Sequence, residues 1–376
     1  MLNSGLGFSI CFYFTISVFT VWLSMQVKSE YRVGKAGEKG KVQNKILLYA
    51  IFAILFLVSA LRFNVGNDYE NYAYTAHEAS VNGYVVTEIG FNWLVKVVYA
   101  IFGGEYYEIV FALFAFATIC IFLKAMYEQS EEFYETFFLF TTLGLYFQTF
   151  NTMRYYLALA IAFYASRYVL NKDWIRFILW IVVASLFHKS VLIVTPLYWL
   201  CTIEWKKWFV AVITLGTAIC FVLQKPLLQL ALYLYPSYRN TQYLEGGTSL
   251  PSIVRSILIL LFLIWVFKTN EIEEKKQREI LFYGRLNYLS LLVYTGFSFL
   301  PVITRIGYYL TVFQILLLPL LVMQIKDEKK KKLARNIIII ASVIYFTFFL
   351  FTAHKPGIGL LPYQSWLFTT ERFSYK

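Results

Sequence analysis

The stretch "NTMRYYLALAIAFYASRYVL" (151–170) decides the fold class, because most of its residues are apolar and it is about as long as a membrane helix. Small residues recur in it at four-residue intervals, as Ala158, Ala162 and Ser166. This spacing lets two membrane helices pack closely, so the face is expected to point into a bundle of helices. Arg154 lies on the same face and is therefore expected to point inward as well.

The composition of the whole chain is that of a membrane protein. Of 376 residues, 59% are hydrophobic and only 15% are charged, which leaves too much apolar surface for a soluble domain. Cytoplasmic loops rich in Lys and Arg explain the formal net charge of +12, so no nucleic-acid partner is expected. No cofactor or metal is expected either. The cysteines form no ligand or disulfide pattern and all lie in apolar segments: Cys11, Cys120, Cys201 and Cys220.

Hydropathy predicts an all-α, polytopic protein, with twelve transmembrane helices in one membrane domain over residues 1–376. The first apolar run lacks a basic start and a small-residue cleavage site, so it is interpreted as a retained helix and not as a signal peptide. The predicted spans cover about 8–27, 45–61, 106–124, 135–150, 153–170, 174–187, 189–203, 208–224, 252–268, 285–300, 304–325 and 336–352.

The distribution of Lys and Arg sets the predicted orientation, since short cytoplasmic loops of membrane proteins are enriched in both residues. Five basic segments are placed inside: 28–45, 171–176, 205–208, 268–285 and 326–335. Both chain termini then lie outside. The longer outer segments are the loop 62–105, the aromatic-rich loop 225–251, which is suited either to cover a sugar chain or to form an interface belt, and the tail 353–376.

This orientation requires that residues 84–102 do not cross the membrane. Glu88, Asn92 and Lys96 recur at four-residue intervals and form one polar stripe on a helix that is otherwise apolar. Such a pattern is typical of an amphipathic helix in the outer membrane interface, or of a re-entrant segment.

Arg154 and His188 therefore emerge on the outer side, and each has two interpretations. Arg154 is either an anchor that extends to lipid headgroups or a clamp for an anionic group inside the bundle. His188, within "SLFHKSVLI" (185–193), is either a hydrogen-bonded structural residue or a proton carrier near neutral pH.

Two more helix ends carry charge on the same side. Arg305 has Tyr308 and Tyr309 on its helix face, which indicates either an aromatic belt with a basic anchor or a wall beside an anion. Asp68 either caps the helix that follows it or acts as a base. One outward-facing polar site, built from several helix ends, is the simplest arrangement, and two further arginines fall on this side: Arg62 and Arg255.

Four segments, in their order and spacing, resemble the EpsG/Wzy-like family of bacterial polysaccharide polymerases. They are "RFNVGNDYENY" (62–72), "FNTMRYYLALAIAFYA" (150–165), "LFHKSVLIVTPLYW" (186–199) and "ITRIGYYLTVFQILLLPLL" (303–321). Together they extend over most of the chain. The usual family pattern has a glutamine after the arginine, where this chain has Tyr155, so the role of that glutamine is either unfilled or unneeded here.

The resemblance implies a GT-C-like glycosyltransferase in the bacterial plasma (inner) membrane, with its active site facing the periplasm or the exterior. Such an enzyme transfers a growing chain from undecaprenyl diphosphate to a hydroxyl of a new lipid-linked repeat unit. It needs neither a nucleotide sugar nor a metal. The partners that the resemblance implies are the lipid-linked oligosaccharide and membrane lipid, together with a chain-length regulator and a flippase.

Arginines suit this chemistry, because they stabilise the negative charge that builds on a leaving diphosphate. Arg154 and Arg305 are the first candidates for this role, and Arg255 and Arg62 are weaker ones. The attacking hydroxyl must also lose a proton. The candidate bases are His188 and Asp68, and the candidates for orienting the sugar are Tyr69, Tyr72, Tyr155, Tyr308 and Tyr309.

Other classes of membrane protein remain as alternatives. A flippase or exporter of lipid-linked sugars should carry basic residues at mid-span, whereas the charges here lie at helix ends on one side, and no internal repeat indicates a transporter. An O-antigen-ligase-type transferase usually has a larger outer loop than 225–251. A membrane acyltransferase should have a deeply placed His beside an Asp or Asn. The chain also lacks the common nucleotide-binding and hydrolase motifs.

Overall fold

The structure is a computed structural model, and it describes residues 4–28, 30–83, 85–234, 249–300, 303–355 and 357–369. Within these ranges the chain consists of helices and connecting segments, and the one isolated β-bridge pairs Arg62 with Ser365. The all-α class that the sequence predicts is confirmed.

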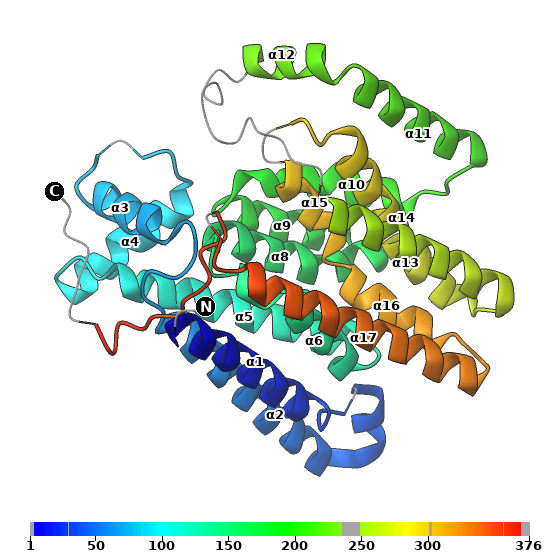
Figure 1. The fold of residues 1–376 in the computed structure, drawn as a ribbon, viewed down its shortest axis with the longest axis horizontal. Coiled ribbons are helices and arrows are strands. Elements are labelled where there is room, and N and C mark those ends of the chain that lie inside the picture. Colours follow the sequence, from blue (N-terminus) through cyan, green and yellow to red (C-terminus); the bar gives the residue numbers. More distant parts are fainter. Residues whose placement is uncertain are drawn as a thin grey trace. The chain divides into compact units, whose positions relative to one another are not determined.

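The helices follow one another along the chain as Figure 1 shows. The first half contains α1 (Ser4–Ser24), α2 (Glu30–Ala60), α3 (Tyr69–Ser80), α4 (Ile89–Phe102), α5 (Tyr107–Gln129), α6 (Phe133–Thr142), α7 (Leu145–Gln148), α8 (Met153–Leu170) and α9 (Trp174–Ser185). The second half contains the 3-10 helix η1 (Lys189–Ile193), α10 (Val194–Thr202), α11 (Lys207–Val222), α12 (Gln224–Leu234), α13 (Leu250–Thr269), α14 (Glu274–Gly296), α15 (Ile303–Thr311), α16 (Gln314–Met323) and α17 (Glu328–Thr352).

Fewer of these helices are long enough to cross a membrane than the sequence suggests. In the described part of the chain, six segments are long and apolar enough: Gly5–Ser24, Lys41–Ala60, Tyr107–Gln129, Leu250–Thr269, Ile303–Met323 and Glu328–Thr352. α11 and α12 add a seventh if this pair, bent by 80°, is one span. The protein is thus a multi-pass membrane protein, but the predicted count of twelve spans and the GT-C-like fold are not confirmed.

Two local features explain much of the difference in span number. The predicted span 135–150 is interrupted at Gly144, whose φ of +76° is a backbone conformation that glycine adopts easily, and it becomes the separate helices α6 and α7. The predicted span 174–187 forms α9, which has 12 residues. At about 1.5 Å per residue this helix rises only about 18 Å, whereas the apolar core of a bilayer is about 30 Å thick.

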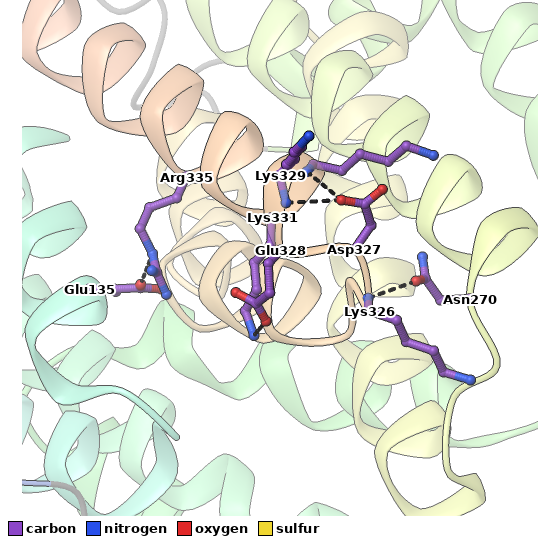
Figure 2. Close-up of polar contacts among 9 residues, drawn as sticks. Glu135, Asn270, Lys326, Asp327, Glu328, Lys329, Lys331 and Arg335 are labelled. Atoms are coloured by element: carbon purple, nitrogen blue, oxygen red, sulfur yellow. Dashed lines mark hydrogen bonds and ion pairs between the residues drawn. The ribbon is translucent and has the colours of Figure 1, made fainter.

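The basic segment 326–335, which the sequence analysis places in a loop, is mostly the start of α17 (Figure 2). Asp327 Oδ1 accepts hydrogen bonds from the backbone N–H groups of Lys329 at 2.9 Å and Lys330 at 3.2 Å, as a helix N-cap does. The prediction of a loop over 28–45 is wrong in the same way, because α2 begins at Glu30.

Two compact units make up the chain. Unit 1 consists of Met1–Ala165, Leu179–Lys189 and Lys332–Lys376, and unit 2 consists of Ser166–Ile178 and Ser190–Lys331. In unit 1, Arg335 of α17 forms an ion pair with Glu135 of α6, with 2.6 Å between Nε and Oε1 (Figure 2).

α8 is largely enclosed, with most of its residues buried. Ala158, Ala162 and Ser166 are fully buried, which confirms that this face points inward. Tyr155 and Leu159, on other faces, are buried as well. A helix that is apolar on all sides is expected to lie inside a bundle, and the sequence of α8 meets that condition.

In unit 1, the tail after α17 packs against the middle of α1 and the end of α2. The Tyr13 hydroxyl donates to the carbonyl of Leu360 at 2.9 Å, and the Phe63 N–H donates to the carbonyl of Gln364 at 2.8 Å. The Tyr363 hydroxyl donates to the carbonyl of Val58 at 3.0 Å. These bonds hold the tail beside the turn that follows α2.

The segment 62–105 contains α3 and α4. α4 has 14 residues and is shorter than a membrane span, in agreement with the prediction that 84–102 does not cross. Two residues of its polar stripe form hydrogen bonds with nearby residues of the same segment. Lys96 Nζ donates to Asn82 Oδ1 at 2.7 Å, and the Thr87 hydroxyl donates to Asn92. A location of α4 in the outer interface stays a prediction.

Candidate functional site

Arg154 lies in the first turn of α8 and forms an ion pair with Glu88 in unit 1. Both side chains are largely buried, with 15% and 14% of their surfaces exposed. The guanidinium carbon lies 5.3 Å from the ring centre of Tyr72 and 5.4 Å from that of Phe91, within range of cation–π attraction. Arg154 therefore points into the protein, as the face of its helix predicts.

The donors of Arg154 are only partly used. Nη1 contacts Glu88 Oε2, but Nε is buried and has no hydrogen-bond partner among the described residues. Buried N–H groups normally have a partner, because leaving one unpaired costs about 1–3 kcal/mol. The guanidinium thus keeps an unused donor in a largely enclosed position.

Glu88 connects three segments of unit 1. It stands immediately before α4 in extended conformation and does not cap its own helix. Its Oε2 pairs with Arg154, and its Oε1 accepts a hydrogen bond from the backbone N–H of Lys189 at 3.1 Å. The carboxylate therefore joins the start of α8 to the turn after α9.

A close approach of two backbones supports this junction. The Gly90 N–H donates to the carbonyl of Leu186 at 2.8 Å. A Cβ atom at position 90 would lie 2.6 Å from that same carbonyl oxygen, so only glycine fits without a shift. The turn that carries His188 is fixed against the start of α4 by this contact.

His188 lies in that turn and is half-buried. Its backbone N–H donates to the carbonyl of Ala184 at 3.0 Å, which continues the last turn of α9. Its ring meets the ring of Tyr155 edge to face, with 5.4 Å between centres. Since Tyr155 follows Arg154, the structure brings three predicted site residues together at the start of α8.

The turn that contains Asp68 lies against the residues just before α8. The Asn67 N–H donates to Asn151 Oδ1 at 2.9 Å, and the Gly66 N–H donates to the carbonyl of Gly359 at 2.8 Å. Asp68 is at the N-cap position of α3, but its side chain makes no capping hydrogen bond. The capping interpretation of its carboxylate is therefore not met.

The two tyrosines of α3 have different surroundings. Tyr72 is buried with its ring against Arg154, and its N–H donates to the carbonyl of Asp68 at 2.9 Å. Tyr69 is buried in the core, where its ring packs edge to face on Phe111 at 4.8 Å. Its hydroxyl donates to the carbonyl of Arg62 at 3.3 Å. Of the two, Tyr72 is the one beside the arginine of α8.

Arg62 is enclosed in the core of unit 1. Its Nη1 donates to the carbonyl and, at 3.1 Å, to the hydroxyl of Ser59. Its guanidinium lies 5.1 Å from the ring centre of Phe150, and no carboxylate pairs with it among the described residues. Burial lowers the pKa of Arg62, and nearby tyrosines oppose that shift. These contacts make Arg62 part of the packed core of unit 1.

Unit 2 holds a second set of predicted residues. Tyr309 is fully buried, with its hydroxyl 3.2 Å from that of Ser190 and its carbonyl accepting a hydrogen bond from Tyr198 at 2.9 Å. It is a packing residue, whereas Arg305 and Tyr308 on the same helix are half-buried.

Tyr294 of α14 lies beside the two helices that carry the candidate residues Arg255 and Arg305. A Cβ atom at Gly307 in α15 would overlap the ring and hydroxyl of Tyr294, so α14 and α15 are in close contact there. Arg255 of α13 interacts with Tyr294 electrostatically. Arg255 and the helix of Arg305 are therefore both next to one tyrosine of α14.

Sequence reasoning did not identify Glu88 or Asn151 as site residues. Glu88 belonged to the polar stripe of 84–102, but a stripe does not reveal which cation a carboxylate will meet. In the part of the chain that the structure describes, no three His, Cys, Asp or Glu side chains gather as metal ligands. The aromatic loop 225–251 falls partly on α12, and its residues 235–248 lie outside the described residues.

Comparison with protein families identifies one family model that matches the chain. The model described as "EpsG family" matches residues 45–365, a range that includes Glu88, Arg154, His188 and Arg305. No curated protein matches the chain, and neither does any solved structure.

Proposed function

Because the chain belongs to the EpsG family, we propose that it is a polysaccharide polymerase that joins oligosaccharide repeat units carried on undecaprenyl diphosphate. Family membership and the apolar helices support a membrane glycosyltransferase. We further propose that the reaction takes place at the outer face of the bacterial plasma membrane, where the predicted orientation puts the start of α8.

The observation that carries the proposal is the partly unsatisfied Arg154. In the reaction, the bond between the anomeric carbon of the donor sugar and the diphosphate oxygen breaks, and the oxygen keeps the electron pair. A hydroxyl oxygen of the acceptor unit forms the new bond to that carbon. An arginine that is held in place and has a free donor stabilises the departing diphosphate through a charge-assisted hydrogen bond.

Glu88 supports this role by orienting the guanidinium. Glu88 is therefore proposed as a positioning residue. It holds one edge of Arg154 and leaves the Nε donor for the diphosphate.

His188 is the proposed base that takes the proton of the attacking hydroxyl. It lies in the turn that Glu88 holds through the Lys189 N–H, and its ring is set against Tyr155. Histidine exchanges a proton readily near neutral pH, and a positioned base contributes about 10²–10⁴-fold to the rate. Asp68 is kept as the second candidate. Arg305 and Arg255 of unit 2 are proposed as further ligands of the diphosphate.

The test uses the purified full chain in lipid nanodiscs with a synthetic undecaprenyl-diphosphate-linked repeat unit. A ladder of products, absent for Arg154→Ala, is the expected result. Arg278→Ala is the matched control, because this arginine is exposed and pairs with Glu274 on the surface of α14. A full ladder from Arg154→Ala would overturn the assignment. Movement of the lipid-linked unit across a membrane, without a ladder, would instead indicate the flippase alternative.

A further inference from the structure

Amide side chains from two distant segments meet beside the start of α8 in unit 1. The turn before α3 supplies Asn67, the end of α7 supplies Gln148, and the turn before α8 supplies Asn151. Asn151 links the two segments, because its Oδ1 accepts the Asn67 N–H at 2.9 Å and its Nδ2 donates to Gln148 Oε1 at 3.0 Å. These three residues form the amide cluster.

The backbone beneath the amide cluster is held in place by contacts within and between the two segments. Gly66 has a φ of +106°, and a Cβ atom there would overlap the carbonyl oxygen of Phe150, so the two backbones touch. Asn64 also has a positive φ, of 49°, and its Nδ2 donates to Glu70 Oε1 at 3.1 Å across the turn. A ligand that binds to a backbone already ordered in this way loses less free energy to conformational entropy.

The amide cluster keeps a donor and an acceptor that no protein group uses. Among the described residues, Gln148 Nε2 donates to no protein atom and Asn67 Oδ1 accepts from none. Asn67 Nδ2 lies 3.5 Å from Asp68 Oδ1, which is long for a hydrogen bond. Asn67 is exposed and Gln148 is half-buried, so a ligand can reach both. An amide offers a donor and an acceptor side by side, which matches the hydroxyl groups of a sugar.

The charge of the turn before α3 separates the amide cluster from the arginine beside it. Residues 63–95 contain no Lys or Arg, whereas Asp68 and Glu70 lie in or next to the turn itself. Tyr72 connects the turn to α8, since its N–H donates to the carbonyl of Asp68 at 2.9 Å and its ring centre lies 5.3 Å from the guanidinium carbon of Arg154. The amide cluster is therefore next to a position suited to an anion, but is itself suited to neutral groups.

We propose that the amide cluster binds sugar hydroxyls of the repeat unit, beside the arginine that takes the diphosphate. This inference rests on the proposed polymerase function. The two parts of one substrate are then recognised by different chemistry, with amides for the neutral hydroxyls and Arg154 for the anion. A sugar without the matching hydroxyl leaves the amides unpaired, so the amide cluster also contributes to the choice of sugar.

The experiment measures binding of two probes to the purified full chain in lipid nanodiscs. The repeat-unit oligosaccharide, released by mild acid from the native lipid-linked unit, is titrated by saturation-transfer NMR. Undecaprenyl diphosphate without sugar is measured by native mass spectrometry. Asn67→Ala keeps the backbone N–H that Asn151 accepts. It is expected to weaken oligosaccharide binding about fivefold and to leave undecaprenyl diphosphate binding unchanged. Asn171→Ala is the matched control, because this exposed asparagine follows the opposite end of α8.

Gln148→Ala tests the other segment and should also weaken oligosaccharide binding about fivefold. Melting temperatures show whether each variant folds. If both variants bind the oligosaccharide as tightly as Asn171→Ala does, the amide cluster is not a sugar site, even when the wild-type chain forms a product ladder. If both bind it more weakly but the wild-type chain forms no ladder, the sugar site stands and the polymerase proposal fails. An equal loss of both probes would overturn the separate recognition of sugar and diphosphate.

Discussion

Arg154 and Glu88, 66 positions apart in the sequence, form a largely buried ion pair at the start of α8. The pair joins a helix inside unit 1 to the segment that precedes α4, and the other carboxylate oxygen reaches the turn after α9. The orientation of the arginine thus depends on residues that the sequence places in three separate segments.

Glu88→Gln is expected to lower both stability and the rate of polymerisation. Removing one partner of a largely buried pair leaves the other charge uncompensated, at a cost of about 1–3 kcal/mol. The arginine also loses its fixed orientation, so the rate should fall about tenfold or more. Thermal melting in detergent and the product ladder measure the two effects. Glu274→Gln, at an exposed pair, is the control and should change the free energy of unfolding by less than about 1 kcal/mol. A Glu88→Gln protein with the wild-type rate would show that Arg154 needs no such support.

His188→Gln is expected to lower the polymerisation rate about 10²–10⁴-fold if His188 takes the proton of the acceptor hydroxyl. The wild-type rate should then rise with pH around neutrality, as a histidine loses its proton, and the variant should lack this rise. Single-turnover rates between about pH 5.5 and 8.5 provide the measurement. Asp68→Asn, made in parallel, should keep the pH dependence. If Asp68→Asn lost the rise with pH and His188→Gln kept it, the base would be Asp68.

Gly66→Ala is expected to destabilise unit 1 and to disturb the start of α8. The residue has a φ of +106°, and a Cβ atom there would overlap the carbonyl oxygen of Phe150. Gly103→Ala separates the two causes, since Gly103 has a φ of +70° but no atom within 4 Å of its Cβ position. Gly66→Ala should therefore be less stable than Gly103→Ala by about 1–3 kcal/mol in denaturant unfolding. If Gly66→Ala and Gly103→Ala lost the same free energy of unfolding, the contact with Phe150 would relax without cost.

The tail is expected to be released at alkaline pH. Burial raises the pKa of Tyr363 to about 12, from an ordinary value of 10.0. The folded chain thus holds this proton more tightly than the unfolded chain does. The contribution of this proton to the free energy of unfolding is fully present below about pH 10 and is lost as the pH rises through 12. Melting temperatures between pH 8 and 12 should fall less steeply for Tyr363→Phe than for the wild type. Tyr233→Phe is the control, because Tyr233 is exposed. Its melting temperatures should follow those of the wild type over the same pH range.

Several features of the site were accessible from the sequence because they depend on local periodicity. The four-residue spacing of Ala158 and Ala162 indicated the inward face of α8, and with it the direction of Arg154. The stripe of Glu88, Asn92 and Lys96 indicated a helix in this segment, and α4 forms there with 14 residues. Both predictions concern one helix at a time, where a residue's face follows from its position.

Other features depended on distant parts of the chain. The number of spans was overestimated because hydropathy does not register a break such as Gly144 or the shortness of α9. The contacts of Tyr309 with Ser190 and Tyr198 could not be predicted either, since a tyrosine at a helix face is suited to several environments. The partner of Arg154 could not be read from the sequence, because nothing local links positions 88 and 154.

The contact of Gly66 with Gly359 also has a consequence for how the protein is made. A ribosome synthesises the chain from its N-terminus, so the turn that precedes α3 leaves it long before Gly359 exists. Until then the Gly66 N–H lacks its partner, and Phe63 lacks the carbonyl of Gln364. The surroundings of α8 are therefore completed only late in biogenesis, after the tail has reached the same side of the membrane.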